Sequence, residues 1–199
     1  IHKVPLMPVR DMECRRTPWH SLNVGAPSTG TSMKDWEGPI DTGSIPGDGS
    51  AFDVIVVGGG PSGSAAASYN ALNGCRVLLI EKAVWPRDKI CGDAVGGKSL
   101  SHVKELGVKD MVEKTPHFMV DSIVFGSANG NTVKVMLPQD EFEKKMAGYS
   151  LPRMQFDYMM FKRATEIVIE AGGSVIQGFD VKEVLEDEGK IVGVSGSFG

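Results

Sequence analysis

The chain has 199 residues, of which 41% are hydrophobic, and a formal net charge of −4 at pH 7. This length predicts one or two domains with enough apolar content to form a core. The negative charge provides no long-range attraction to nucleic acid or to an anionic bilayer, and no apolar run approaches the roughly 20 residues that span a membrane.

Residues 1–50 hold six of the eleven prolines and show no sustained apolar period. Segments of this composition bury too little surface to offset the entropy that is lost on ordering. We therefore expect residues 1–50 to form a disordered or non-native extension. The alternative is that Trp19 and Trp36 dock on a neighbouring surface. The first domain is expected to begin close to Ser50.

The stretch Phe52–Lys82 is typical of a strand, a glycine turn, a helix and a second strand. Its turn, Gly58-Gly59-Gly60-Pro61-Ser62-Gly63, satisfies the pattern G-x-G-x-x-G. In such a turn the first glycine (Gly58) allows the tight bend and the second (Gly60) lets the backbone approach a pyrophosphate. The third (Gly63) brings the helix close to the sheet. The phosphates are expected on free N–H groups at the positive end of the helix.

The rest of this stretch fits the same interpretation. Gly74 is expected to end the helix in the left-handed conformation, and the strand Arg76–Ile80 stops at Glu81. The Glu81 carboxylate can accept hydrogen bonds from an adenosine ribose. The pattern predicts a dinucleotide site, open at this point to NAD or FAD. The alternative is a glycine-rich turn in another α/β protein.

The remaining predicted elements are helices with one parallel strand and, between or after them, antiparallel hairpins. A glycine-rich loop follows Lys82, and a short helix is predicted over Lys98–Leu106. A hairpin is expected over residues 121–137, around Asn129-Gly130. A helix over Met154–Ala171, a parallel strand over Val175–Gln177 and a hairpin formed by Val181–Leu185 and Lys190–Val194 complete the prediction. The first hairpin interrupts the βαβ order and is expected in a second, antiparallel sheet.

Cysteine and histidine spacing points away from metal chemistry. Cys14, Cys75 and Cys91 contain no C-x-x-C pair, which suggests neither a disulfide framework nor a zinc site. His102 and His117 have no partners at ligand spacing, so no metal is expected. Cys75 is interpreted as a packing residue. These features favour a reducing, cytoplasmic setting.

The order of the elements resembles the flavin-dependent oxidoreductases of the p-hydroxybenzoate hydroxylase type, and within them the geranylgeranyl reductase family. The similarity rests on VIVVGGGPSGSAAA, LLIEK, KICGDAVGGKSL, LPRMQFD and DVKEVLEDEGKIVGV, and covers roughly residues 51–196. The family's later Gly-Asp motif and substrate-domain remainder have no counterpart here. The chain therefore resembles the N-terminal portion of a longer enzyme.

The resemblance implies an α/β fold, a Rossmann-like FAD-binding domain with a parallel sheet and an inserted antiparallel hairpin, incomplete at the C-terminus. Residues 51–199 would form this domain, with 115–150 contributing to a substrate-side β-sheet. By position in the motifs, the resemblance implies that Gly63 lies near the pyrophosphate, Glu81 holds the adenosine ribose and Val181 contacts the adenine. It also implies that Arg153 lies near the phosphate and ribityl portion, and that Cys91, Gly92 and Ala94 belong to the loop that passes the flavin. The LLIEK and Cys-Gly motifs contribute further residues to the implied cofactor site. The residues expected to bind the cofactor are Gly58, Gly60, Pro61, Ser62, Gly63, Glu81, Lys82, Cys91, Gly92, Ala94, Arg153 and Val181.

The function implied by the resemblance is an FAD-dependent reductase that saturates C=C bonds of geranylgeranyl chains on lipids or diphosphates. NADPH or reduced ferredoxin would supply electrons, and an isoprenoid lipid substrate would bring the protein to a membrane surface. Cys91 is the candidate catalytic residue, as a positioner or part of a proton path; its alternative is a buried packing residue. Asp93 is interpreted either as a proton relay or as a cap of a turn.

Two other functions remain open on the sequence. One is a flavin monooxygenase or halogenase of the same class, which would use O₂ instead of an alkene. The other is a non-catalytic nucleotide-binding fragment.

Overall fold

The computed structural model describes residues 2–5, 40, 42, 46, 51–137 and 148–199. The chain is divided into two compact units. The first unit consists of Ile1–Arg87 with Asp157–Gly199, and the second of Asp88–Phe156.

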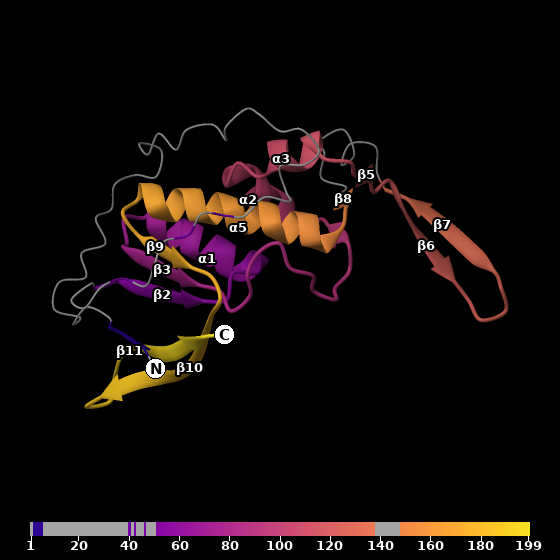
Figure 1. Ribbon diagram of the computed structural model, residues 1–199. Helices are drawn as coiled ribbons and strands as arrows, with labels where there is room; N and C mark the ends of the chain where they lie inside the picture. Colours follow the sequence, from indigo (N-terminus) through magenta and orange to yellow (C-terminus); the bar gives the residue numbers. More distant parts are fainter. Residues whose placement is uncertain (1, 6–39, 41, 43–45, 47–50, 138–147) are drawn as a thin grey trace. The chain divides into compact units, whose positions relative to one another are not determined.

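A three-stranded parallel sheet forms the centre of the first unit (Figure 1). Its strands are β2 (Val54–Val57), β3 (Val77–Ile80) and β9 (Ser174–Ile176), in the order β2-β3-β9. Every residue of β3 is buried, as expected for the middle strand of a parallel sheet. The apolar, β-branched run Phe52–Val57 predicts a strand buried on both faces as well, but this is wrong for β2, an edge strand in which Val57 is 56% exposed.

Two helices accompany this sheet. Helix α1 (Pro61–Leu72) packs on β2 and β3, and Gly74 follows it with φ +83°, the left-handed ending that the sequence predicts. Helix α5 (Arg153–Glu170) crosses from the second unit into the first and is followed by Gly172 at φ +79°. β9 then takes the predicted place of the third parallel strand.

The first unit also holds an antiparallel sheet in the order β1-β11-β10. β10 (Phe179–Asp187) and β11 (Lys190–Phe198) form the predicted second hairpin, and β1 (His2–Pro5) pairs with β11. One hydrophobic cluster joins this sheet to the parallel one; its buried members are Val4, Phe52, Leu78, Ile80, Ile176, Phe179 and Val194.

Strand β1 lies in the segment that composition predicts to be disordered. Its Val4 is 2% exposed and stands opposite Val194, so residues 2–5 are an ordered edge of the sheet. Pairing with a distant strand supplies hydrogen bonds and burial that local composition does not reveal. Apart from positions 40, 42 and 46, the remainder of residues 1–50 lies outside the described residues.

The second unit contains short elements. The predicted helix at Lys98–Leu106 is α2 (Ser99–Glu105), and α3 (Lys109–Lys114) follows it without having been predicted. Three two-residue strands, β4 (Ala94–Val95), β8 (Tyr149–Ser150) and β5 (Phe118–Met119), form a sheet in that order. Such short pairings lack a periodic signal in the sequence.

The hairpin at residues 121–137 consists of β6 (Ser122–Gly126) and β7 (Thr132–Met136), with Gly130 at φ +86° in the turn. Ile123 stands opposite Val135 and Phe125 opposite Val133. These four side chains share one face of the pleat and are between 47% and 63% exposed. The hairpin therefore carries an exposed apolar face.

Cys75 is 4% exposed, as expected for a packing residue, but it is disulfide-bonded, so the prediction that the cysteines form no disulfide is wrong. An odd cysteine count carries no information about which pair meets in space. None of the helices in the described ranges is long and apolar enough to cross a membrane.

Candidate functional site

The glycine turn between β2 and α1 is fixed by backbone geometry. Gly58 has φ +103°, a conformation that favours glycine, and its N–H donates to the carbonyl of Ile80 at 2.7 Å. A Cβ on Gly63 would clash with the carbonyl oxygen of Gly58. Both glycines are therefore required to bring the start of α1 against the end of β2.

Gly59 occupies a variable position of the motif, yet it too is confined. A Cβ there would clash with the ring of Phe161 on α5 and would lie 3.2 Å from Cβ of Glu81. Phe161 is completely buried. The sequence predicts no role for Phe161, because an apolar residue on a helix carries no signal for the particular turn that it contacts.

Gly60 differs from Gly59 and Gly63 because a Cβ at this position would clash with nothing. The nearest atom to a Cβ at this position would be Nη2 of Arg87, at 3.5 Å. Gly60 is also the N-cap of α1, with no side-chain cap; Pro61 opens the helix without an N–H, and Ser62 is exposed. No side chain at Gly60 therefore blocks access to the positive end of α1. A helix N-terminus of this kind is suited to binding a pyrophosphate.

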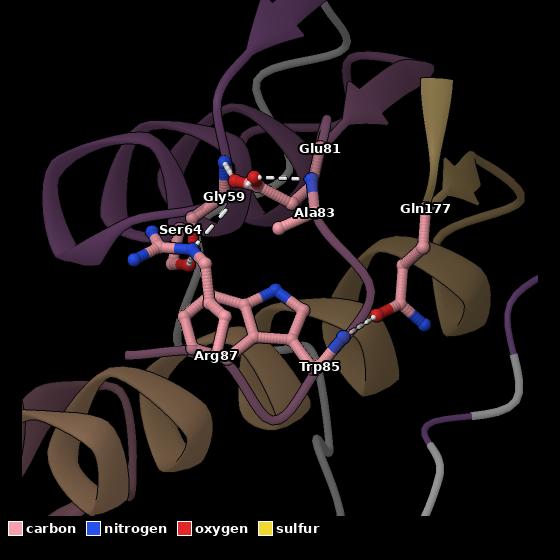
Figure 2. A network of polar contacts seen from close by, with 7 residues as sticks. All are labelled: Gly59, Ser64, Glu81, Ala83, Trp85, Arg87 and Gln177. Atoms are coloured by element: carbon pink, nitrogen blue, oxygen red, sulfur yellow. Dashed lines mark hydrogen bonds and ion pairs between the residues drawn. The ribbon is translucent and has the colours of Figure 1, made fainter. Parts of the chain in front are cut away.

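Glu81 connects the end of β3 to this turn (Figure 2). Its side chain is 9% exposed; Oε2 accepts a hydrogen bond from Gly59 N–H at 2.6 Å and Oε1 accepts one from Ala83 N–H at 2.9 Å. These two bonds fix the orientation of the carboxylate. A carboxylate has about four acceptor positions, so Glu81 retains capacity for ribose hydroxyls.

Arg87 places a cation beside the same turn. Its Nε lies 3.7 Å from Oε1 of Glu81, and its guanidinium carbon lies 4.3 Å from the ring centroid of Trp85 (Figure 2). The arginine side chain is 17% exposed. A guanidinium held over an aromatic ring near Gly60 is suited to phosphate oxygens.

Trp85 packs between Arg87 and Phe161. Its ring stacks on Phe161 with centroids 5.3 Å apart, and its backbone N–H donates to Oε1 of Gln177 at 2.8 Å. Its indole Nε1 is buried and has no hydrogen-bond partner within the described part of the chain. The sequence predicts only a loop at Trp85, because the contacts that order it come from α5 and from the residue after β9.

Two further predicted residues lie away from the turn. Nζ of Lys82 is 3.0 Å from Oδ2 of Asp180, and hydrogen bonds from Lys182 and Lys82 hold the pKa of Asp180 below its usual value. Val181 stands opposite Gly196 and packs, half-buried, against the hydrophobic cluster. Their contacts with a cofactor stay predictions.

In the second unit, Cys91 is exposed and is the free cysteine among the described residues. The packing alternative for Cys91 is therefore wrong. Gly92 is exposed as well, and a Cβ there would meet nothing within 4 Å. Ala94 opens β4 and stands opposite Ser150.

Asp93 joins the cysteine loop to the start of α5. Its Oδ1 accepts a hydrogen bond from Arg153 N–H at 3.0 Å, and its carbonyl accepts one from Leu151 N–H at 3.0 Å. The sequence left Asp93 either as a proton relay or as the cap of a turn. In the structure its side chain caps α5, which begins 60 residues later in the chain, instead of an adjacent turn.

The parallel sheet, the glycine turn at the start of α1 and the acid at the end of β3 define a dinucleotide-binding α/β protein. The family model for FAD dependent oxidoreductases matches residues 53–197. The chain belongs to this family.

The curated relatives include reductases and a receptor. Conditioned medium factor receptor 1 of Dictyostelium discoideum is 43% identical over 86 residues, which cover 43% of this chain and 17% of that protein. Digeranylgeranylglycerophospholipid reductase 2 of Methanopyrus kandleri is 35% identical over 144 residues, which cover 72% of this chain and 32% of the reductase. A menaquinone reductase of Mycobacterium tuberculosis is 32% identical over 70% of this chain and 32% of its own. The chain thus spans about a third or less of these relatives.

Solved structures share the fold. The myxobacterial chondrochloren halogenase, an FAD-dependent enzyme, has a TM-score of 0.63 at 27% identity and covers 72% of this chain and 32% of its own. A geranylgeranyl bacteriochlorophyll reductase-like protein of Thermoplasma acidophilum has a TM-score of 0.55 at 25% identity, covering 73% and 34%. These similarities agree with the predicted Rossmann-type flavoprotein fold.

Proposed function

We propose that this chain forms the FAD-binding portion of a reductase that saturates C=C bonds of geranylgeranyl chains on lipids or diphosphates. The observation that carries FAD binding is the glycine turn at the positive end of α1, where Gly60 has no side chain and lies next to Arg87, together with the oriented carboxylate of Glu81. The choice of substrate class is supported by the 35% identity to a digeranylgeranylglycerophospholipid reductase.

In this proposal the first unit holds the adenosine diphosphate half of the cofactor. Gly58 and Gly63 bring the N–H groups of α1 to the pyrophosphate, and Gly60 leaves room for it. Glu81 accepts hydrogen bonds from the ribose hydroxyls with the acceptor positions that Gly59 and Ala83 leave free.

Residues of the second unit serve the flavin end in the same proposal. When bound, FAD supplies the hydride chemistry that alkene saturation requires. Cys91, with its exposed thiol, orients the alkene or passes a proton, and Gly92 and Ala94 let the backbone approach a flat ring. Arg153 contributes a cation for anionic oxygens of the cofactor.

The substrate side is assigned to residues 115–150, of which 138–147 lie outside the described residues. The hairpin face formed by Ile123, Phe125, Val133 and Val135 is apolar and exposed, which suits an isoprenoid chain. A substrate of this kind lies in a lipid layer, so contact with a membrane surface is part of the proposal. NADPH or reduced ferredoxin is the proposed electron donor.

One observation favours a second candidate function. The structural similarity to an FAD-dependent halogenase is high, with a TM-score of 0.63. An O₂-dependent halogenase or monooxygenase is therefore the alternative.

The experiment has two stages. The purified chain is titrated with FAD, and binding is followed by quenching of flavin fluorescence; a chain that leaves the fluorescence unchanged would contradict the cofactor site. A protein that carries this chain at the length of its relatives is then reduced and given geranylgeranyl lipid without O₂. Saturated product supports the reductase, whereas product that forms only with O₂ and halide supports the halogenase.

Cys91 is tested in the same single-turnover assay. Cys91→Ala should slow product formation from pre-reduced protein, and Cys91→Ser should show whether a hydroxyl suffices. An unchanged rate in both variants would remove Cys91 from the chemical step.

A further inference from the structure

Asp93 ends a short ladder that runs from β4 and β8 to the start of α5. Val95 stands opposite Tyr149 and Ala94 opposite Ser150. The next bond continues this ladder, since Leu151 N–H donates to the Asp93 carbonyl at 3.0 Å. The Asp93 side chain then accepts from Arg153 N–H, also at 3.0 Å. One residue therefore completes the sheet pairing and caps the helix.

Helix α5 needs such a cap from elsewhere in the chain. The residue before Arg153 is Pro152, whose side chain has no hydrogen-bond acceptor. The Pro152 carbonyl accepts from Gln155 N–H and Phe156 N–H, at 3.0 and 3.1 Å, but the Arg153 N–H points outside the helix. A carboxylate at this end also interacts favourably with the helix dipole.

The segment before Asp93 is held far less. Within the described residues, hydrogen bonding by residues 88–92 is limited to a local bond from Lys89 N–H to Oδ1 of Asp88. Cys91 precedes Asp93 by two residues, which limits the separation of their Cα atoms to about 7 Å. In the part of the chain that the structure describes, Asp93 is therefore the residue nearest to Cys91 that makes a long-range hydrogen bond.

We propose that Asp93 is a positioning residue that holds the Cys91-Gly92 loop and the Arg153 backbone in one fixed relation, and that it acts as a hydrogen-bond acceptor and not as a proton relay. Its value for catalysis rests on the proposed function, in which Cys91 and Arg153 both serve the flavin cofactor. The anchoring itself depends only on the contacts of Asp93.

Three variants separate these roles. Asp93→Asn keeps a side-chain acceptor oxygen but cannot relay a proton at ordinary pH, and Asp93→Ala removes the side-chain acceptor while keeping the carbonyl that pairs with Leu151. Asp88→Ala is the matched control, because it removes a carboxylate in the same loop whose bond is local.

The first measurement uses the cofactor-free chain and follows hydrogen exchange of the Arg153 amide. We expect Asp93→Ala to raise its exchange rate about tenfold or more, as loss of protection at a helix end predicts. Asp93→Asn and Asp88→Ala should stay within about threefold of the parent chain, since both keep this bond. A protected Arg153 amide in Asp93→Ala, or an Asn variant that exchanges like Ala, would overturn the proposal.

The second measurement follows alkylation of Cys91 by iodoacetamide, read by mass spectrometry, with and without saturating FAD. Bound FAD should slow the reaction in the parent chain and in Asp93→Asn, and Asp93→Ala should lose a measurable part of this protection, since it keeps only the carbonyl bond to Leu151. If FAD is bound and Asp93→Asn also loses protection, an acceptor role is contradicted. If FAD fails to protect the parent chain, the flavin role of Cys91 fails, and the exchange measurement still decides the anchoring.

Should Asp93→Ala not fold, Asp93→Asn keeps the proposal testable. The Asn variant must then match the parent chain in amide exchange and in FAD protection, and a departure in either overturns the acceptor role.

Discussion

The N–H of Gly59 donates to Oε2 of Glu81 at 2.6 Å across 22 residues, so the acid that is expected to bind the ribose also fixes the glycine turn. Glu81→Ala should leave the Gly59 and Ala83 N–H groups without their acceptor. We expect a loss of about 1–3 kcal/mol in the free energy of unfolding, the usual cost of an unpaired buried donor.

This change is measured by urea unfolding of the chain, together with FAD titration. Glu170→Ala is the control, because Glu170 is an exposed acid on α5. A Glu81→Ala chain as stable as this control would show that the carboxylate does not hold the turn.

Gly60 and Gly63 separate cofactor binding from folding. Gly63→Ala should destabilise the chain, because its Cβ clashes with the carbonyl oxygen of Gly58. Gly60→Ala should leave stability within about 1 kcal/mol, since its nearest neighbour is the flexible end of Arg87, but should weaken FAD binding at least about tenfold. Unfolding curves and FAD titrations of both variants check this, and equal effects on stability would contradict it.

Arg87 is expected to act on the phosphates and not on the ribose. Arg87→Gln removes the cation beside Gly60 while keeping a polar side chain. ADP binding should weaken more than adenosine binding, because only ADP carries the anionic oxygens that a guanidinium prefers. Calorimetric titration measures the affinity of the parent chain and of Arg87→Gln for ADP and for adenosine. An equal loss of affinity for both ligands would mean that Arg87 supports Glu81 or Trp85 and does not contact the phosphates.

Gly59 and Phe161 should be energetically coupled. Gly59→Ala drives a methyl group into the Phe161 ring, and Phe161→Leu leaves a smaller side chain in its place. The double variant should lose less stability than the sum of the two single variants, by about 0.5–3 kcal/mol. Additive losses in denaturant unfolding would mean that the turn moves away from the ring instead.

Tyr149 provides a prediction for alkaline pH. Burial and its hydrogen bond to Glu113, with Oη to Oε1 at 2.9 Å, raise the pKa of Tyr149 to about 12. Since the ordinary tyrosine pKa is about 10, the stability that the neutral phenol contributes is complete below pH 10. It is lost as pH rises from about 10 through 12.

Absorbance titration of tyrosinate checks this expectation. The parent chain should show one late-titrating tyrosine that Tyr149→Phe lacks, and the variant's stability should fall less steeply over the same pH range. A Tyr149→Phe chain with an unchanged late step would assign that step to another tyrosine.

Several elements could be predicted because their signals are local. The turn Gly58–Gly63, the helix after it and the acid at Glu81 lie in one continuous stretch, and glycines with positive φ mark the ends of α1 and α5. The hairpin around Gly130 follows from alternating residues beside a turn. The family resemblance, confirmed by the family model, follows from the same motifs.

Contacts between distant residues needed the tertiary structure. Pairing of His2–Pro5 with β11, packing of Phe161 against Gly59, and the cap that Asp93 provides for α5 join positions far apart in the chain. None of these contacts has a periodicity or spacing that marks it.

The sequence by itself thus determined the nucleotide-binding turn, the acid beside it and the FAD-dependent family, since backbone conformation and helix polarity depend on neighbouring residues. Only the tertiary structure decided that Glu81 orients the turn through Gly59, that Arg87 lies between Trp85 and Gly60, and that Asp93 accepts a hydrogen bond from the first residue of α5. Those relations depend on which surfaces meet when the chain is packed, and packing is a property of the whole fold.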